Sequence, residues 1–185
     1  MTRPANLEAI EAAGGIGWDD WCRWLDDRGG RDLDHGALAA LAAERLTGGP
    51  DNPLWWAQSV AVAYEQQIGC RLPGQRPDGT FFVSVTRTLP LEPEAAMTAW
   101  TTYVAEGGSI VGSTLAGSTL AEDARTSVTP KRRYWRTSFT DGSSFQIAVE
   151  AAAGGSRVTA TQERLTTPEA KERSRQIWRT VLAAL

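Results

Sequence analysis

The stretch that decides the fold is KRRYWRTSFTDGSSFQIAVE, residues 131–150. Apolar and polar side chains alternate along residues 132–139 and again along residues 144–150. A period of two is typical of β-strands with one buried face. Between the two runs, Asp141-Gly142 favours the positive φ angles of a type I′ turn. The sequence therefore predicts an antiparallel hairpin.

The hairpin leads into a third strand and a closing helix. Residues 153–156 (AGGS) have the composition of a second tight turn, and residues 157–164 alternate again. Thr167 is a typical N-cap, and Pro168 suits the first position of a helix. Apolar residues then recur with helical spacing as far as Leu185, so one helix face needs a covering surface. The apolar face of the three-stranded meander is the expected partner.

The region before the hairpin adds a strand and a helix. Residues 81–87 alternate, and a helix is predicted to begin at residues 92–94 (EPE) and to end at Gly107-Gly108. We expect residues 109–123 to form a loop with a broken helical turn, and residues 125–128 to form a short strand. The predicted class is α+β, with a curved antiparallel β-sheet gripping a long C-terminal helix.

The N-terminal part has a helical pattern instead. Residues 18–28, 34–46 and 53–68 each repeat apolar side chains at helical spacing, and turns rich in glycine separate them. Five of the eight tryptophans fall within the first 56 residues, so this part needs a core of its own. We predict a small three-helix bundle.

The boundary between the two parts is predicted at a stretch rich in proline and glycine. The predicted domains are a helical bundle at residues 1–70, a linker at residues 71–80 and a sheet-and-helix domain at residues 81–185.

Composition excludes several classes of protein. The formal net charge is -3, which gives no strong field to attract nucleic acid or an anionic membrane. No apolar run resembles a signal peptide or approaches the length of a membrane span, so we expect a cytoplasmic protein. Cys22 and Cys70 are two isolated thiols, predicted to be reduced.

No pattern of catalytic or metal-binding residues is present. His35 is the only histidine, so neither a histidine-based metal site nor a cofactor is predicted, and its position suits a helix start. Glu65 with Tyr64 and Gln58 could form a polar cluster containing a general acid, although a solvated helix face is the commoner arrangement. The basic and aromatic residues 131–136 alternate between two faces, which favours a solvated strand end over a nucleic-acid site.

Residues 80–185 resemble a known superfamily. The motifs are RTLPLEPEAAMTAW (87–100), the hairpin of residues 131–150, and RVTATQERLTTPEAKERSRQIWRTVLAAL (157–185). Together they resemble the helix-grip superfamily, also called START-like or birch-pollen-allergen-like. The most similar family is the one named after the activator of the heat-shock chaperone ATPase. Its members usually have more strands between the first helix and the meander, so residues 105–130 imply an abridged sheet.

The N-terminal part has a second resemblance. Residues 15–75, and above all WWAQSVAVAYEQQIG (55–69), resemble a small helical domain of unknown function found in bacterial proteins. This resemblance implies no activity.

The superfamily resemblance implies a cleft between the sheet and the C-terminal helix. The inward-facing residues that would line a pocket there are Trp100, Trp135, Phe145, Ile147, Val149, Val158, Ile177, Trp178 and Val181. The alternative is a closed core filled by the same side chains. Trp55, Trp56 and Tyr64 are candidates for packing between the two domains.

Three functions are compatible with the sequence. The first is a non-catalytic binding protein that holds an apolar small molecule or lipid in the cleft. The second is a protein-partner adaptor, or co-chaperone-like module, which binds through the exposed sheet face or the tryptophan-rich bundle. The third, a helix-grip enzyme of the cyclase or hydrolase type, rests on fold analogy alone. A packed core together with an exposed apolar patch elsewhere would favour the adaptor.

Overall fold

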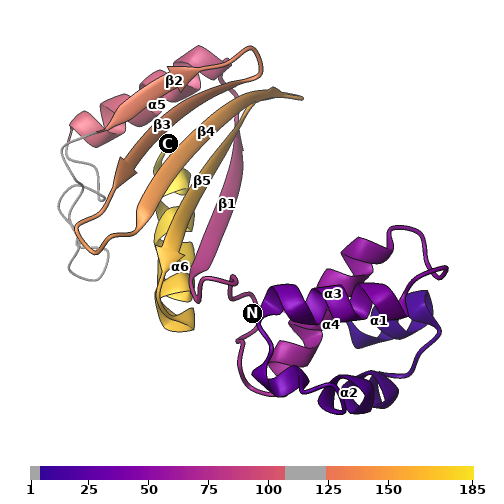
Figure 1. Cartoon of the computed structure of the whole chain (residues 1–185). Coiled ribbons are helices and arrows are strands. Elements are labelled where there is room, and N and C mark those ends of the chain that lie inside the picture. Colours follow the sequence, from indigo (N-terminus) through magenta and orange to yellow (C-terminus); the bar gives the residue numbers. More distant parts are fainter. Residues whose placement is uncertain (1–4, 107–123) are drawn as a thin grey trace. The chain divides into compact units, whose positions relative to one another are not determined.

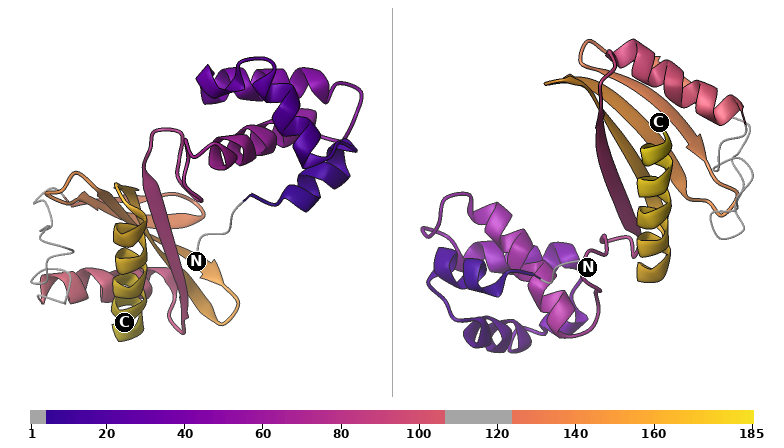
Figure 2. Two further views of the ribbon diagram at one scale, coloured as in Figure 1. Left: turned by 90° about the horizontal axis from the view of Figure 1, so that it is seen from below. Right: turned by 180° about the vertical axis from the view of Figure 1, so that it is seen from behind.

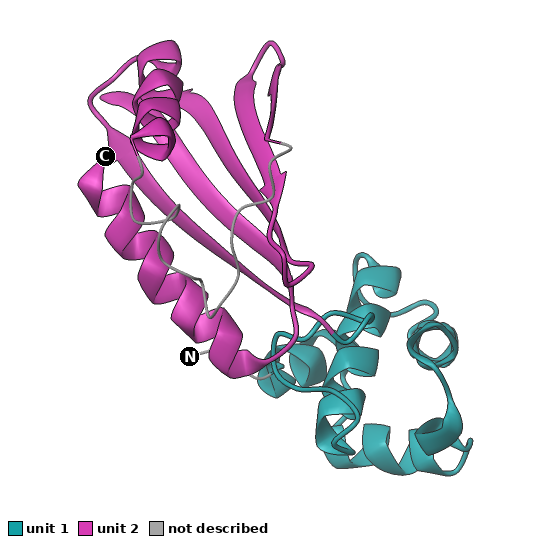
Figure 3. Cartoon of the chain, turned by 90° about the vertical axis from the view of Figure 1, so that its left-hand side faces the viewer, with its two compact units in different colours: residues 1–79 teal, residues 80–185 magenta. Residues whose placement is uncertain are grey.

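The computed structural model describes residues 5–106 and 124–185 (Figure 1). The chain forms two compact units, residues 1–79 and residues 80–185 (Figure 3). Each unit has its own hydrophobic core. The units are therefore described one at a time.

The second unit contains a five-stranded antiparallel sheet with the strand order β1-β5-β4-β3-β2. Its strands are β1 (Phe81–Leu89), β2 (Arg125–Val128), β3 (Arg132–Ser138), β4 (Ser144–Ala152) and β5 (Gly155–Leu165). Its helices are α5 (Pro93–Ala105) and α6 (Pro168–Ala184). The predicted strands and C-terminal helix are all present, including the short strand at residues 125–128.

Both helices lie on the same face of the sheet, as the view from behind shows (Figure 2). Because side chains alternate along each strand, every second residue of β1, β3, β4 and β5 points toward the helices. The long helix α6 packs on β1 and β5, and α5 lies over β3, β4 and β5. The α+β class and the packing of the C-terminal helix on an antiparallel sheet are thus confirmed.

The turn between β3 and β4 differs from the predicted type. Gly142 has a φ of 83°, but Asp141 has no positive φ, whereas a type I′ turn requires both. The amide of Gly142 donates to the carbonyl of Phe139, and the amide of Phe139 donates to the carbonyl of Ser143. The loop therefore has three residues, Thr140 to Gly142, and the left-handed glycine closes it in the manner of a bulge. The sequence places the turn correctly but does not give its length.

The turn between β4 and β5 depends on one glycine. Gly155 has a φ of 135°, and a Cβ atom built there would lie 2.1 Å from the carbonyl oxygen of Leu89. Next to it, the hydroxyl of Ser156 donates to the carbonyl of Leu91 at 2.5 Å. The end of β1 is thus held directly against the start of β5.

A bulge interrupts the pairing of β1 with β5. Phe81 pairs with Leu165 but Val83 pairs with Gln162, so β5 has one more residue than β1 in this interval. Arg164 takes up the extra length in the left-handed conformation, with a φ of 60°. As a result Leu165 points inward again, although it is an odd number of residues after Gln162.

The first unit is a bundle of α-helices with one short 3₁₀ segment, η1 (Gly30–Asp32). The helices are α1 (Leu7–Gly14), α2 (Trp18–Asp26), α3 (His35–Arg45) and α4 (Pro53–Gln67). The three predicted helices correspond to α2, α3 and α4. Helix α1 is additional; its sequence LEAIEAAG buries only Ile10, which gives too little periodicity to detect.

The helix caps confirm one prediction and correct another. Asp34 accepts a hydrogen bond from the amide of Ala37, as expected of an N-cap. Asn52 occupies the N-cap of α4, but it adopts a left-handed conformation with a φ of 58° and makes no capping hydrogen bond. Pro53 in the first helical turn is as predicted.

The predicted linker is largely folded against the bundle. Arg71 donates from its amide to the carbonyl of Glu65 and from Nε to the carbonyl of Gln75 at 2.8 Å. The amide of Leu72 donates to Gln75 Oε1, also at 2.8 Å. The division between the units falls after Gly79, inside the predicted linker.

Candidate functional site

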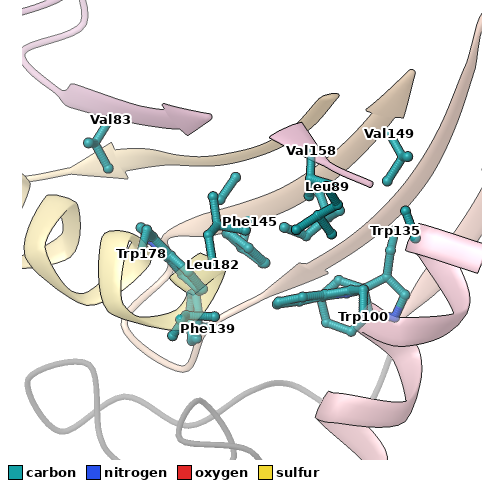
Figure 4. Packing of buried hydrophobic residues seen from close by; sticks show 14 of the residues in the cluster. Val83, Leu89, Trp100, Trp135, Phe139, Phe145, Val149, Val158, Trp178 and Leu182 are labelled. Carbon is teal, nitrogen blue, oxygen red and sulfur yellow. The ribbon is translucent and has the colours of Figure 1, made fainter. Parts of the chain in front are cut away.

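The predicted pocket residues converge on the inner face of the sheet (Figure 4). Eight of them are at most 5% exposed, and Ile177 packs partly buried against them. These eight are Trp100, Trp135, Phe145, Ile147, Val149, Val158, Trp178 and Val181. The sequence therefore predicts their common location correctly.

Their aromatic rings pack against one another. Phe145 and Trp178 stack with centroids 3.9 Å apart and an interplanar angle of 7°. Trp100 lies edge-on to Trp135, with ring centroids 5.4 Å apart. Its ring centroid is 5.8 Å from that of Phe145. Side chains that fill one another's contact surface in this way form a core. The packing of the described residues favours the closed-core alternative over a ligand pocket at this position.

Two buried hydrogen bonds among three polar groups fix the same core. Trp178 donates from Nε1 to Gln162 Oε1 at 2.9 Å, and Gln162 Nε2 donates to the hydroxyl of Ser143 at 3.0 Å. Gln162 is 1% exposed, so these contacts replace water for all three groups. They tie α6 to β5 and to the turn after β3, which is a structural role.

An apolar groove lies in the first unit, between α1 and α4. It has a volume of about 360 Å³ and is lined by Ala5, Asn6, Ala9, Ile10, Trp55, Trp56, Gln58, Ser59 and Val62. We call this surface the tryptophan groove. Trp55 is 61% exposed, and its neighbour Leu54 is 73% exposed. The rings of Trp55 and Trp56 meet edge to face with centroids 4.6 Å apart.

The three residues predicted to pack between domains have different roles inside the bundle. Trp55 is exposed and Trp56 is partly buried against the bundle core. Tyr64 is 0% exposed, and its hydroxyl donates to Asp26 Oδ1 at 2.6 Å. Burial and the carboxylate of Asp26 raise the pKa of Tyr64 to about 12. Tyr64 thus belongs to the core of the first unit; packing of Trp55 and Trp56 between domains stays a prediction.

A polar cluster lies beside the groove. Nδ1 of His35 lies 3.1 Å from Glu65 Oε1, and Nε2 of His35 lies 2.7 Å from Gln58 Oε1. A guanidinium nitrogen of Arg71 donates to Glu65 Oε2 at 2.6 Å. Glu65 and Gln58 do form a cluster, as one reading of the sequence predicted, but Tyr64 points elsewhere. With a guanidinium and an imidazole already bound to Glu65, its carboxylate is held in an ion pair rather than offered to a substrate.

The outer face of the sheet carries a second, polar groove. It has a volume of about 430 Å³, and its lining includes Arg125, Arg136, Gln146 and Glu163. The guanidinium of Arg136 donates to Gln146 Oε1 and Ser127 Oγ and lies 4.1 Å from the ring centroid of Tyr134. These contacts hold the guanidinium of Arg136 flat along the outer sheet surface, as expected of a solvated strand face.

The described part of the chain, residues 5–106 and 124–185, contains no group of three or more His, Cys, Asp or Glu side chains suited to a metal ion. Cys22 is partly buried and Cys70 is exposed, and both are free thiols. Burial, followed by the nearby carboxylates of Asp26 and Asp19, raises the pKa of the Cys22 thiol, which disfavours a nucleophilic thiolate. No helix among the described residues is long and apolar enough to cross a membrane.

The tryptophan groove is the feature that reasoning from sequence missed. One of its walls comes from α1 and the two residues before it, and the hydrophobic pattern does not reveal this helix. Two signals pointed toward it. Asn6 is a good N-cap before a run of helix-forming residues, and it does accept a hydrogen bond from the amide of Ala9. Adjacent tryptophans on one helix cannot both face the same core, so one of the Trp55–Trp56 pair had to face outward.

Comparison with known proteins identifies no family for this chain. No family model matches the chain, and no curated protein matches it. A crystal structure of the Mll3558 protein from Rhizobium loti is 15% identical, with a TM-score of 0.34, over 57% of this chain and 97% of that one. A protein from Rhizobium leguminosarum, described as uncharacterized, is 12% identical, with a TM-score of 0.27, over 45% of this chain and 76% of that one. Likenesses this weak carry no argument about fold or function.

Proposed function

We propose that this chain is a non-catalytic adaptor that binds a protein partner through the tryptophan groove. The observation that carries the proposal is the exposure of Leu54 and Trp55, at 73% and 61%, at the edge of an apolar groove. Large apolar side chains grouped on a surface are typical of interaction sites, and tryptophan is enriched among residues that dominate binding energy.

The packed core of the second unit favours an adaptor over a protein that holds a small molecule between sheet and helix. The side chains expected to line a cleft for an apolar molecule are packed against each other there. Glu65, which the sequence suggested as a general acid, is engaged in an ion pair with Arg71. An adaptor needs neither an interior cavity nor a catalytic group.

The tryptophan groove also suits an apolar small molecule, the second candidate. Its volume of about 360 Å³ lies within the range usual for ligand sites, and polar groups at Asn6, Gln58 and Ser59 could orient such a molecule. A lipid or metabolite in this groove would retain the binding role and change only the kind of ligand.

The two candidates separate by native mass spectrometry of protein purified from its own cells. For an adaptor we expect a protein partner in stoichiometric complex, which the variant Trp55→Ala loses and the variant Val128→Ala retains. Val128 is a matched control because it is 66% exposed and lies in the other unit. A bound small molecule lost on Trp55→Ala would favour the second candidate. Partner binding unchanged by Trp55→Ala, tested with the purified partner, would refute the groove as the contact surface.

A further inference from the structure

Gln58 is a polar residue of the tryptophan groove, and a series of side-chain contacts through His35, Glu65 and Arg71 holds it in place. Gln58 lines the groove, and its Oε1 lies 2.7 Å from Nε2 of His35. The other ring nitrogen of His35, Nδ1, lies 3.1 Å from Glu65 Oε1. Arg71 holds the opposite oxygen of Glu65 at 2.6 Å. The side chain at the groove is therefore connected to buried charges in the bundle.

His35 links Gln58 to Glu65. Both of its ring nitrogens lie within hydrogen-bond distance of a side-chain oxygen, Nε2 of Gln58 Oε1 and Nδ1 of Glu65 Oε1. Two charged groups lie at the ring: Glu65 from α4, and Arg71 from the segment after α4, whose Nη1 is 3.4 Å from Nδ1. Glu65 is itself neutralised by Arg71.

The contact with His35 leaves the amide nitrogen of Gln58 available. Because Oε1 of Gln58 is turned to His35, its Nε2 points away from the ring. Among the described residues no group accepts a hydrogen bond from this amide. The groove lining thus combines apolar walls with this N–H donor and the polar side chains of Asn6 and Ser59.

We propose that the groove recognises an apolar side chain and an adjacent backbone carbonyl of a basic partner segment, with Gln58 donating to that carbonyl. This inference rests on the proposed adaptor function. The basic character follows from charge complementarity: Asp51 lines the surface beside Trp55 and Trp56, and no lysine or arginine among residues 5–106 and 124–185 lines the groove. Residues 1–79 carry twelve acidic and seven basic side chains.

The test uses the full chain and the capped peptide acetyl-Arg-Leu-Arg-amide, followed by NMR of the indole N–H signals of Trp55 and Trp56. We expect the peptide to shift both signals and the variant Gln58→Leu to bind it roughly 2- to 10-fold more weakly, the range for one lost hydrogen bond. The variant Gln67→Leu is the matched control, because Gln67 is on the same helix and outside the groove.

Each part of the inference can fail separately. Equal affinity of the wild type and Gln58→Leu overturns the role of Gln58 and leaves the adaptor function intact. Equal binding of acetyl-Glu-Leu-Glu-amide overturns the basic partner. Ethylbenzene bound as tightly as the peptide, in the wild type and in Gln58→Leu, assigns the groove to small molecules. Unmoved Trp55 and Trp56 signals with every ligand refute the groove itself, and with it the adaptor function.

Discussion

At the scale of single residues, the fold depends on a few positions where replacement of the side chain should reduce stability. Gly155 and Gln162 are the clearest cases, because each lies where another side chain would either collide or leave a polar group without a partner. Neither requirement is visible as periodicity in the sequence.

Replacing Gly155 with alanine should destabilise the second unit strongly. Its Cβ would meet the carbonyl of Leu89, so we expect a loss of roughly 3 kcal/mol or more. Gly154 is the control: it also has a positive φ, of 81°, but its Cβ would meet nothing within 4 Å, which predicts a loss of roughly 1–2 kcal/mol. Urea unfolding measures both. Equal losses would show that the contact with Leu89 relaxes at no cost.

The variant Gln162→Leu should be destabilising although leucine is apolar and similar in size. It leaves Trp178 Nε1 without its acceptor and Ser143 without its donor, each at roughly 1–3 kcal/mol. Chemical unfolding with tryptophan fluorescence provides the measurement. Gln146→Leu, on the solvent side of β4, should change stability much less, and a result in the opposite order would contradict the structural role of Gln162.

At the scale of elements, contacts between helices decide the pH response of the bundle. Tyr64 of α4 donates to Asp26 of α2. Burial raises the pKa of Tyr64 from 10.0 to about 12, so its contribution to stability is complete below pH 10.0 and is lost as the pH rises toward 12. Hydrogen bonds from Tyr64 and then Arg31 lower the pKa of Asp26, whose contribution is present above pH 3.8 and is lost on acidification.

The variant Tyr64→Phe tests this linkage. It should reduce stability by about 1 kcal/mol at neutral pH and should remove the part of the alkaline destabilisation that falls between pH 10.0 and about 12. Thermal unfolding of the first unit, recorded across this range and compared with the wild type, gives the answer. Parallel profiles for the two proteins would mean that Tyr64 does not titrate with unfolding.

The sequence predicted elements better than it predicted connections. Alternation at residues 144–150 and the helical pattern from Pro168 predicted the bounds of β4 and α6 within a few residues. A half-buried strand or helix needs apolar residues at regular spacing, and this spacing is visible in the sequence. Helix α1 was missed because alanine and glycine carry little periodic signal. The three-residue turn was missed because Asp-Gly is compatible with more than one loop length.

The same limit applies to the candidate sites. Inward-facing residues of a strand can be identified by counting, so the core around Trp178 was anticipated. The tryptophan groove needs two helices that are distant in sequence to meet, and only one of them was predicted. The contact between His35 and Gln58 is a further example of tertiary proximity that spacing does not encode.

At the scale of the whole molecule, the two units have separate cores with no shared residue among those described. Leu25 and Leu182 are matched probes, 0% and 2% exposed, one in each core. Each change to alanine should cost roughly 2–5 kcal/mol, and only in its own unit. Hydrogen exchange by NMR, read separately for residues 5–79 and 80–185, measures this. Loss of protection in both units from either variant would show that they unfold as one.

The bulge at Arg164 has a consequence for comparing this chain with others. Before the bulge, the inward-facing residues of β5 have even numbers and end with Gln162. After the bulge, the inward-facing residue is the odd-numbered Leu165. An alignment to a homologue with an unbroken strand must therefore place a one-residue gap near residues 163–164. Without that gap, the inward-facing Leu165 would be matched to a residue on the wrong side of the sheet.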